Sequence, residues 1–154
     1  MKTKGFTLIE LVVVIIVVGV LAATAVPKFV NLKPEAQTST LQGVKAAMEG
    51  VAAMVYGKSL IAGNHTKATA QIKLANGTDV EIVYGYPNAN GTQWQGLLEL
   101  SDYFASEDFT TDGSFIVYIA ENSTPNNATN DCIAFYLPAT VAGQKPVINV
   151  NDCT

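Results

Sequence analysis

An apolar run of 21 residues, from Phe6 to Val26, constrains this chain more than any other feature. Its polar residues are Thr7, Glu10 and Thr24. A helix rises about 1.5 Å per residue, so a helix of this length spans roughly 30 Å, the thickness of the hydrocarbon core of a bilayer. The run therefore predicts one helix that can cross a membrane.

Glu10 is the unexpected residue in this run. A charged side chain at the centre of a membrane helix costs about 2.5–3.5 kcal/mol on insertion scales, and less toward the helix ends. Either the carboxylate lies in the headgroup zone, where it costs little, or a partner offsets the cost.

The run could also be a secretory signal, because the residues Ala22, Ala23, Thr24 and Ala25 resemble a small-residue cleavage site. That alternative would give a soluble secreted protein. Lysines flank the run on both sides, so charge counting favours a cytoplasmic N-terminus only slightly.

The 154-residue chain carries 14% charged residues and a net charge of −4, which fits one folded domain plus one membrane segment. All nine basic residues are lysines. Guanidinium contacts to phosphates and bases are therefore unavailable, and the acidic balance repels nucleic acid. We expect no nucleic-acid partner.

The two cysteines, Cys132 and Cys153, lie in the last quarter of the chain. They form no CxxC motif, and a lone pair that closes a C-terminal loop favours a disulfide in an oxidising compartment. The alternative is two buried free thiols. An external C-terminal part agrees with a cytoplasmic N-terminus.

The string Lys4-Gly5-Phe6-Thr7-Leu8-Ile9-Glu10-Leu11, followed by the apolar run and Pro27, resembles the prepilin signature of type IV pilins and pseudopilins. The resemblance is strongest up to about Pro34. Within type IVa pilins, the segment from Ala53 to Ile61 resembles the mannose-sensitive haemagglutinin pilins. The family implies three parts. They are a leader, residues 1–5, a membrane and filament-core helix, residues 6–26, and an amphipathic helix with a globular head, residues 27–154, whose C-terminal disulfide loop spans residues 132–153.

The resemblance also implies roles for single residues. A prepilin peptidase would cut after Gly5 and methylate the new amino terminus of Phe6. That amine lies four residues, or about 6 Å of helix rise, before Glu10. A neighbouring subunit shifted by this distance would place its amine beside the Glu10 carboxylate, which would set the register of assembly and offset the buried charge.

Pro27 lacks a backbone donor and should kink or loosen the helix at the end of the run. In related filaments the helix is thought to melt just before this proline, and Gly19 and Thr24, poor helix formers, would ease the melting. The alternative is a simple bend at the membrane surface.

Beyond a second soft point at Lys33-Pro34-Glu35, apolar residues recur with helical spacing at Leu41, Val44, Met48, Val51 and Val55. This stripe predicts an amphipathic helix that reaches about Ile61 and ends at Gly63-Asn64. Together the segments form one discontinuous spine helix from Phe6 to about Ala62.

The remaining chain has strand character. Asn76-Gly77 predicts a hairpin between strands at 69–74 and 80–84. A short helix is expected at 94–104, and further strands at 114–120, 132–137 and 147–150. The predicted fold is α+β, a spine helix whose first half spans the membrane, packed on four or five mostly antiparallel strands, as in the type IV pilin ladle.

The sequence offers little support for a catalytic or metal-binding function. A hydrolytic triad would need His65, the only histidine, but its position just past a predicted helix end favours a solvated turn residue. The acidic residues Asp102, Glu107, Asp108 and Asp112 form a loose cluster that could bind calcium, but they lack EF-hand spacing, and the alternative is a solvated loop. We expect no enzyme activity, no cofactor and no metal.

The resemblance implies the structural major subunit of a type IV pilus, with roles in attachment, biofilm formation and possible retraction-driven motility. Its partners would be other pilin subunits, the prepilin peptidase, an inner-membrane platform, an assembly ATPase, and host or surface glycans. It would be a single-pass inner-membrane protein before assembly and an extracellular filament afterwards. The first alternative is a type II secretion pseudopilin, and the second is a monomeric anchored sugar-binding domain using Trp94, Tyr84 or Tyr86.

Overall fold

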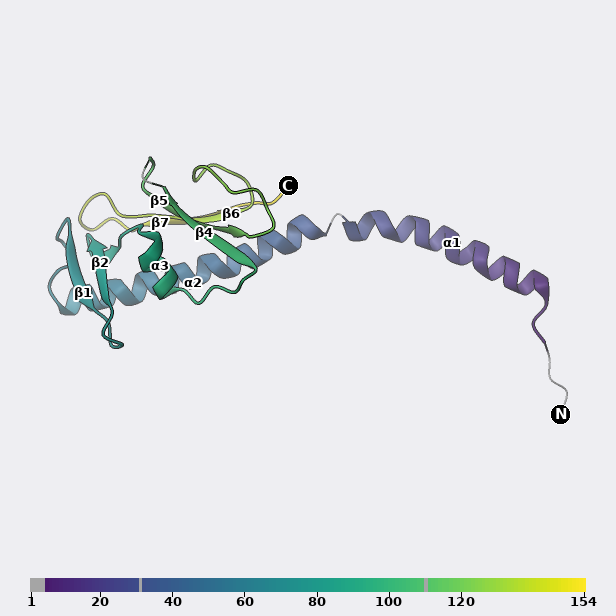
Figure 1. The fold of residues 1–154 in the computed structure, drawn as a ribbon, viewed down its shortest axis with the longest axis horizontal. Helices are drawn as coiled ribbons and strands as arrows, with labels where there is room; N and C mark the ends of the chain where they lie inside the picture. The colour runs from purple at the N-terminus through teal and green to yellow at the C-terminus, as the bar shows by residue number, and fades with distance from the viewer. Residues whose placement is uncertain (1–4, 31, 110) are drawn as a thin grey trace.

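The computed structural model describes residues 5–30, 32–109 and 111–154. A long helical rod runs along the molecule, and a β-rich head covers the C-terminal half of this rod (Figure 1). The rod consists of α1, Leu8–Val30, and α2, Lys33–Ile61. This arrangement confirms the predicted α+β fold with a long N-terminal helix.

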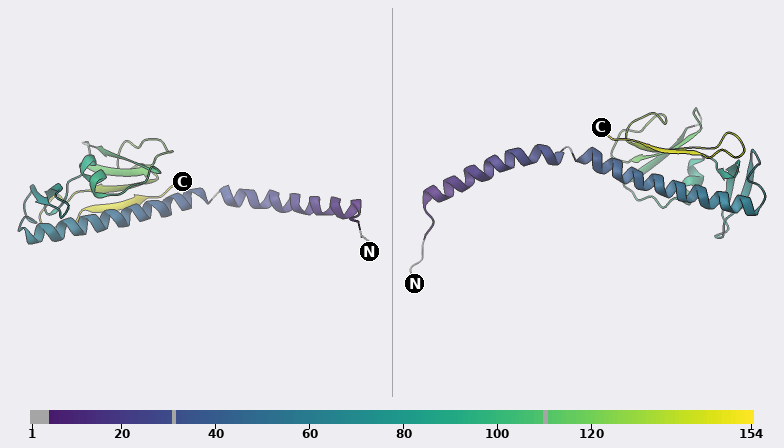
Figure 2. Two further views of the ribbon diagram at one scale, coloured as in Figure 1. Left: turned by 60° about the horizontal axis from the view of Figure 1, so that its bottom comes forward. Right: turned by 180° about the vertical axis from the view of Figure 1, so that it is seen from behind.

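Helix α1 projects away from the head in every view (Figure 2). Its segment Leu8–Ala25 is long and apolar enough to cross a membrane, and none of it is buried against the rest of the chain. α1 includes both Gly19 and Pro27 and continues to Val30. The predicted loosening near Pro27 in a filament stays a prediction.

Helix α2 buries one face beneath the head. The predicted stripe is confirmed, with Leu41, Val44, Met48 and Val55 buried and Val51 half-buried. The soft point expected at Lys33-Pro34-Glu35 is the first turn of α2, because proline is well tolerated there. The helix ends at Ile61, and Gly63 follows with φ of 68°, a left-handed conformation common after helix ends.

The first sheet covers the C-terminal end of α2. It has three antiparallel strands: β1, Ala70–Lys73, β2, Asp79–Val83, and β3, Tyr86–Pro87. The predicted hairpin at Asn76-Gly77 joins β1 to β2. Ile72, Val80 and Ile82 pack with Val55 of α2.

The second sheet lies over the middle of α2 in the order β4-β5-β6-β7, with every pair antiparallel. Its strands are β4, Phe104–Phe109, β5, Ser114–Ile119, β6, Ile133–Leu137, and β7, Val147–Asn151. The described residues of the head therefore form seven strands in two sheets, where four or five strands in one sheet were expected. The unpredicted strands are β3 and β4.

The short helix differs from its predicted position. Helix α3 spans Gly91–Leu97, and the Asn90 side chain caps it by accepting a hydrogen bond from the Gln93 backbone N–H at 3.0 Å. Leu98 is already extended, and Phe104 begins β4. The prediction of helix through residue 104 was wrong: after Leu97 the remaining leucines, Leu98 and Leu100, lie two residues apart, which is not a helical spacing, and Leu98 is extended.

All six residues of β5 are buried, because both faces of this central strand are covered. On one face, Phe115 stacks on Trp94 of α3, with ring centroids 5.4 Å apart. On the other face, Ile116 and Tyr118 pack with Ile133, and Ala128 of the β5–β6 connection joins them. The connection therefore acts as a cover for the sheet.

Candidate functional site: the helix start and the disulfide-closed loop

The first turn of α1 contains a reciprocal pair of hydrogen bonds between Thr7 and Glu10. The Thr7 backbone N–H and the Thr7 hydroxyl each donate to Oε2 of Glu10 at 2.8 Å. The Glu10 backbone N–H donates back to Thr7 Oγ1 at 3.3 Å. This is a capping box, in which a threonine at the N-cap and a glutamate three residues later satisfy each other's backbone donors.

The capping box gives Glu10 partners within its own chain. Both contacts use Oε2, and Oε1 accepts no hydrogen bond from the residues that the structure describes. A carboxylate oxygen has more than one acceptor direction, so the group can take a further donor without breaking the cap. Sequence reasoning assigned Glu10 but missed Thr7, although the T-x-x-E pattern was readable.

Gly5 and Phe6 precede the helix and are exposed. The Phe6 side chain is 83% exposed. It lines a shallow apolar groove together with Ile9, Glu10, Val13 and Val14. The Gly5–Phe6 bond therefore lies outside the helix and is exposed, and Phe6 lies beside the Glu10 carboxylate.

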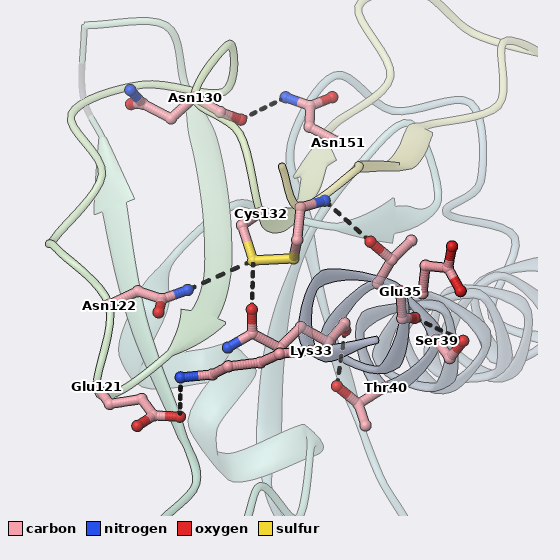
Figure 3. Close-up of a disulfide and its surroundings, with 12 residues drawn as sticks. Lys33, Glu35, Ser39, Thr40, Glu121, Asn122, Asn130, Cys132 and Asn151 are labelled. Atoms are coloured by element: carbon pink, nitrogen blue, oxygen red, sulfur yellow. Dashed lines mark hydrogen bonds and ion pairs between the residues drawn. A yellow bond between two sulfur atoms is a disulfide. The ribbon is translucent and has the colours of Figure 1, made fainter. Parts of the chain in front are cut away.

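The two cysteines form the predicted disulfide, Cys132–Cys153, which rules out two free thiols. Figure 3 shows the bridge beside the first turns of α2. The Cys153 backbone N–H donates to Thr38 Oγ1 at 2.9 Å. The C-terminal end of the chain is therefore fastened both to β6 and to the spine helix.

Further polar contacts hold the segment around the bridge. The Asn151 side-chain amide donates to the carbonyl oxygens of Ala128 and Asn130, at 3.0 and 2.7 Å. Lys33 Nζ lies 3.7 Å from Glu121 Oε1, but both side chains are mostly exposed, so this ion pair adds little. The amide contacts, rather than the ion pair, position the β5–β6 connection.

The loop between β6 and β7 is the exposed part of the disulfide-closed region. Residues 140–145 are exposed, and Gly143 has φ of 84°. Lys145 lies in this loop and is exposed. Its ammonium group forms no ion pair with the residues that the structure describes. Pro138, Gly143 and Pro146 are residues that suit such a loop.

The acidic residues considered for calcium do not converge. The Asp108 carboxylate accepts from the Gly91 backbone N–H at 3.1 Å, and Asp112 accepts from Ser114 and Ala128. Within the described ranges, no three acidic, histidine or cysteine side chains come together as a metal site. These carboxylates anchor loops and helix ends.

His65 lies in a turn as expected, but its side chain is packed rather than solvated. Its ring meets Tyr56 edge-on, with centroids 6.3 Å apart, and its Nδ1 is buried without a hydrogen-bond partner in the described part of the chain. Ser59 lies nearby, but its hydroxyl donates to the Tyr56 carbonyl oxygen at 2.9 Å rather than to the imidazole. Trp94, one of the aromatic residues considered for sugar stacking, is fully buried in the core.

Comparison with known proteins finds an N-terminal motif family and several pilus proteins. The prokaryotic N-terminal methylation motif family matches residues 1–26. The type IV narrow pilus major component of Thermus thermophilus is 44% identical over 54 residues, covering 35% of this chain and 47% of that protein. Fimbrial protein Q of Moraxella bovis is 36% identical over 97 residues, covering 62% and 55%.

The type IV major pilin of Neisseria gonorrhoeae is 36% identical over 90 residues, covering 48% of this chain and 52% of the pilin. The chain thus spans about half the length of the curated relatives it matches. No solved structure matches significantly. The motif and the relatives support a type IV pilin, which confirms the family resemblance, while the finer haemagglutinin subfamily stays a prediction.

Proposed function

We propose that this chain, as a type IV pilin and a structural subunit, is the major building block of a pilus filament. The observation that carries the proposal is the exposed apolar segment Leu8–Ala25 of α1, with a single carboxylate, Glu10, in its first turn. Such a helix needs lipid or other helices around it. A bilayer supplies the first environment, and a filament core built from α1 helices supplies the second.

Processing of the N-terminus precedes assembly. A prepilin peptidase cuts after Gly5 on the cytoplasmic side and methylates Phe6, which leaves residues 6–26 as the membrane anchor and later the filament core. The exposed, non-helical Gly5–Phe6 segment supports this step. An inner-membrane platform and a cytoplasmic ATPase then move the subunit from the membrane into an extracellular fibre.

Register within the filament comes from the new amine of Phe6 and the Glu10 carboxylate of a neighbour. Oε1 of Glu10, which accepts no hydrogen bond within the described ranges, and the apolar groove beside it support this role. In a low-dielectric filament core, the amine offsets the desolvation of the carboxylate, whereas a subunit out of register leaves both charges unpaired.

The head serves attachment at the filament surface. The exposed loop between β6 and β7 and the disulfide that closes it support a role in cell attachment and biofilm formation. Retraction-driven motility would use the same filament. The protein supplies no catalytic group of its own to any of these processes.

The experiment that tests this function is intact-mass measurement with electron microscopy on material sheared from cells that produce the chain. We expect thin filaments whose subunit begins at N-methylated Phe6 and is two hydrogens lighter than its reduced form. A subunit beginning near Val26 would indicate a secreted domain. A processed chain that stays in the inner membrane would indicate a pseudopilin or an anchored monomer.

A further inference from the structure

A hollow of about 530 Å³ lies on the side of α2, between the first sheet and the β6–β7 loop. Helix α2 contributes Glu49, Tyr56 and Gly57, β3 contributes Tyr86, and the loop contributes Lys145 and Pro146. Ligand sites for small molecules typically occupy roughly 300–1,000 Å³ and combine apolar walls with a few polar groups. The hollow has this size and composition, and neither the disulfide nor the helix start accounts for it.

Two tyrosines form a rigid aromatic wall of the hollow. The rings of Tyr56 and Tyr86 stack with centroids 4.5 Å apart and planes within 13° of parallel. Behind Tyr56, Gly85 has φ of 90°, and a Cβ at this position would lie 2.9 Å from Tyr56 Cδ2. His65 meets Tyr56 edge-on from another side. The wall is therefore held in place before any ligand binds, which lowers the entropic cost of binding.

The polar groups of the hollow are one acceptor and one donor. Glu49 and Lys145 line it, and neither forms an ion pair or side-chain hydrogen bond with the part of the chain that the structure describes. A carboxylate accepts hydrogen bonds only, and an ammonium group donates only. A ligand that offers both donors and acceptors next to an apolar face would satisfy both groups.

We propose that this hollow binds a single pyranose unit of a glycan. Pyranose rings carry C–H groups that pack on an aromatic face and hydroxyls that donate and accept at the ring edge. The C–H face would pack on the side of the stacked Tyr56–Tyr86 pair that lines the hollow, Glu49 would accept from hydroxyls, and Lys145 would donate to them. This proposal specifies the ligand class for the attachment role and rests on that part of the proposed function, but not on filament assembly.

Gly57 offers a sharp test, because it lines the hollow and nothing lies within 4 Å of a Cβ built on it. Gly57→Leu would fill the hollow without a clash in the fold and would favour the helix. Gly50→Leu is the matched control: Gly50 lies two helical turns earlier on the same face of α2, is equally open, and does not line the hollow.

Binding is measured on the full processed chain in dodecylphosphocholine micelles, a detergent without sugar, by saturation-transfer NMR. The probes are the methyl glycosides of glucose, galactose, mannose and N-acetylglucosamine, with free alanine as a zwitterionic control. We expect at least one glycoside to bind, Gly57→Leu to weaken it about tenfold or more, and Gly50→Leu to leave it unchanged. Lys145→Ala, on an exposed loop, gives a second variant if Gly57→Leu does not fold.

Three outcomes would overturn the proposal: no glycoside binds, binding survives both Gly57→Leu and Lys145→Ala, or only alanine binds. Filament formation is scored separately by electron microscopy of the same variants. Loss of sugar binding with normal filaments would leave the structural function intact, so the two failures can be told apart.

Discussion

The buried hydroxyl of Tyr136 donates a hydrogen bond to the carbonyl oxygen of Pro87. Tyr136 belongs to β6 of the second sheet, and Pro87 belongs to β3 of the first. The two sheets share no strand pairing, so this bond is a direct polar link between them. Burial raises the pKa of Tyr136 above its usual value, and the hydroxyl therefore stays protonated as a donor at neutral pH.

Tyr136→Phe should destabilise the head, because it leaves a buried carbonyl without its donor while the ring still fills the core. The expected loss is about 1–3 kcal/mol of unfolding free energy. Denaturant unfolding of the full chain in micelles, followed by circular dichroism, measures it. Tyr103→Phe, at an exposed tyrosine outside this contact, is the control and should change little; equal stability of the two variants would mean that the sheets are held together by packing alone.

Gly85→Ala should destabilise the head more than Gly143→Ala does. Both glycines have positive φ, 90° and 84°, so both substitutions carry backbone strain. Only at Gly85 does the new Cβ meet side chains, at 2.9 Å from Ser59 Oγ and Tyr56 Cδ2. Thermal unfolding of the two variants separates strain from crowding. Equal shifts in Tm would show that the Tyr56 wall can move aside.

Removing the disulfide with Cys132→Ala and Cys153→Ala together should cost about 3 kcal/mol on the chain-entropy account, given the separation of 21 residues between the two cysteines. Unfolding should begin at the C-terminal end, where the Cys153–Thr38 hydrogen bond would no longer be supported. Hydrogen exchange of β7 amides checks the location, and denaturant unfolding checks the size. Unchanged protection of β7 would indicate that the strand pairing with β6 suffices.

Asp112 should make stability depend on pH in the acid range. Burial alone would raise the pKa of Asp112, but hydrogen bonds from Ser114 and Ala128 outweigh this effect and hold it below its usual value. A carboxylate with a lowered pKa stabilises the fold above its unfolded-state pKa, about 4, and loses this contribution as pH falls through the folded-state pKa. The stability difference between wild type and Asp112→Asn should therefore be present at pH 6 and shrink below about pH 4. A difference that does not change with pH would contradict this.

The sequence predicts best what is decided locally. Asn76-Gly77 specifies its hairpin because two residues fix the turn, and the α2 stripe is visible because its apolar residues repeat with the helical period. The strand Phe104–Phe109 escapes detection because it lies at a sheet edge and carries Glu107 and Asp108, charges that protect an exposed edge.

The hollow beside α2 could not be predicted from the sequence. Tyr56 and Tyr86 are 30 residues apart, and their stacking depends on how the first sheet folds back onto the helix. The sequence raised Tyr86 for sugar stacking but grouped it with Trp94, which the core buries. Such juxtapositions arise from tertiary packing and leave no periodic signal in the chain.

Glu10 could have two roles, capping the helix through Thr7 and pairing with the amine of a neighbouring subunit. Variants at Thr7 and Glu10 distinguish these roles. Glu10→Gln keeps an acceptor for Thr7 but removes the charge, whereas Thr7→Val keeps the charge but removes the hydroxyl. We expect Glu10→Gln and Glu10→Ala to give membrane-inserted, processed monomers with at least about a tenfold lower filament yield, which requires a loss of only about 1.4 kcal/mol per contact. Thr7→Val should assemble better than either, because the neighbour's amine still finds a carboxylate. Filaments are quantified by shearing and immunoblotting against the membrane-bound pool. Normal yield from Glu10→Gln would show that the charge does not set register, and a defect in Thr7→Val as deep as that in Glu10→Ala would assign the effect to the helix cap.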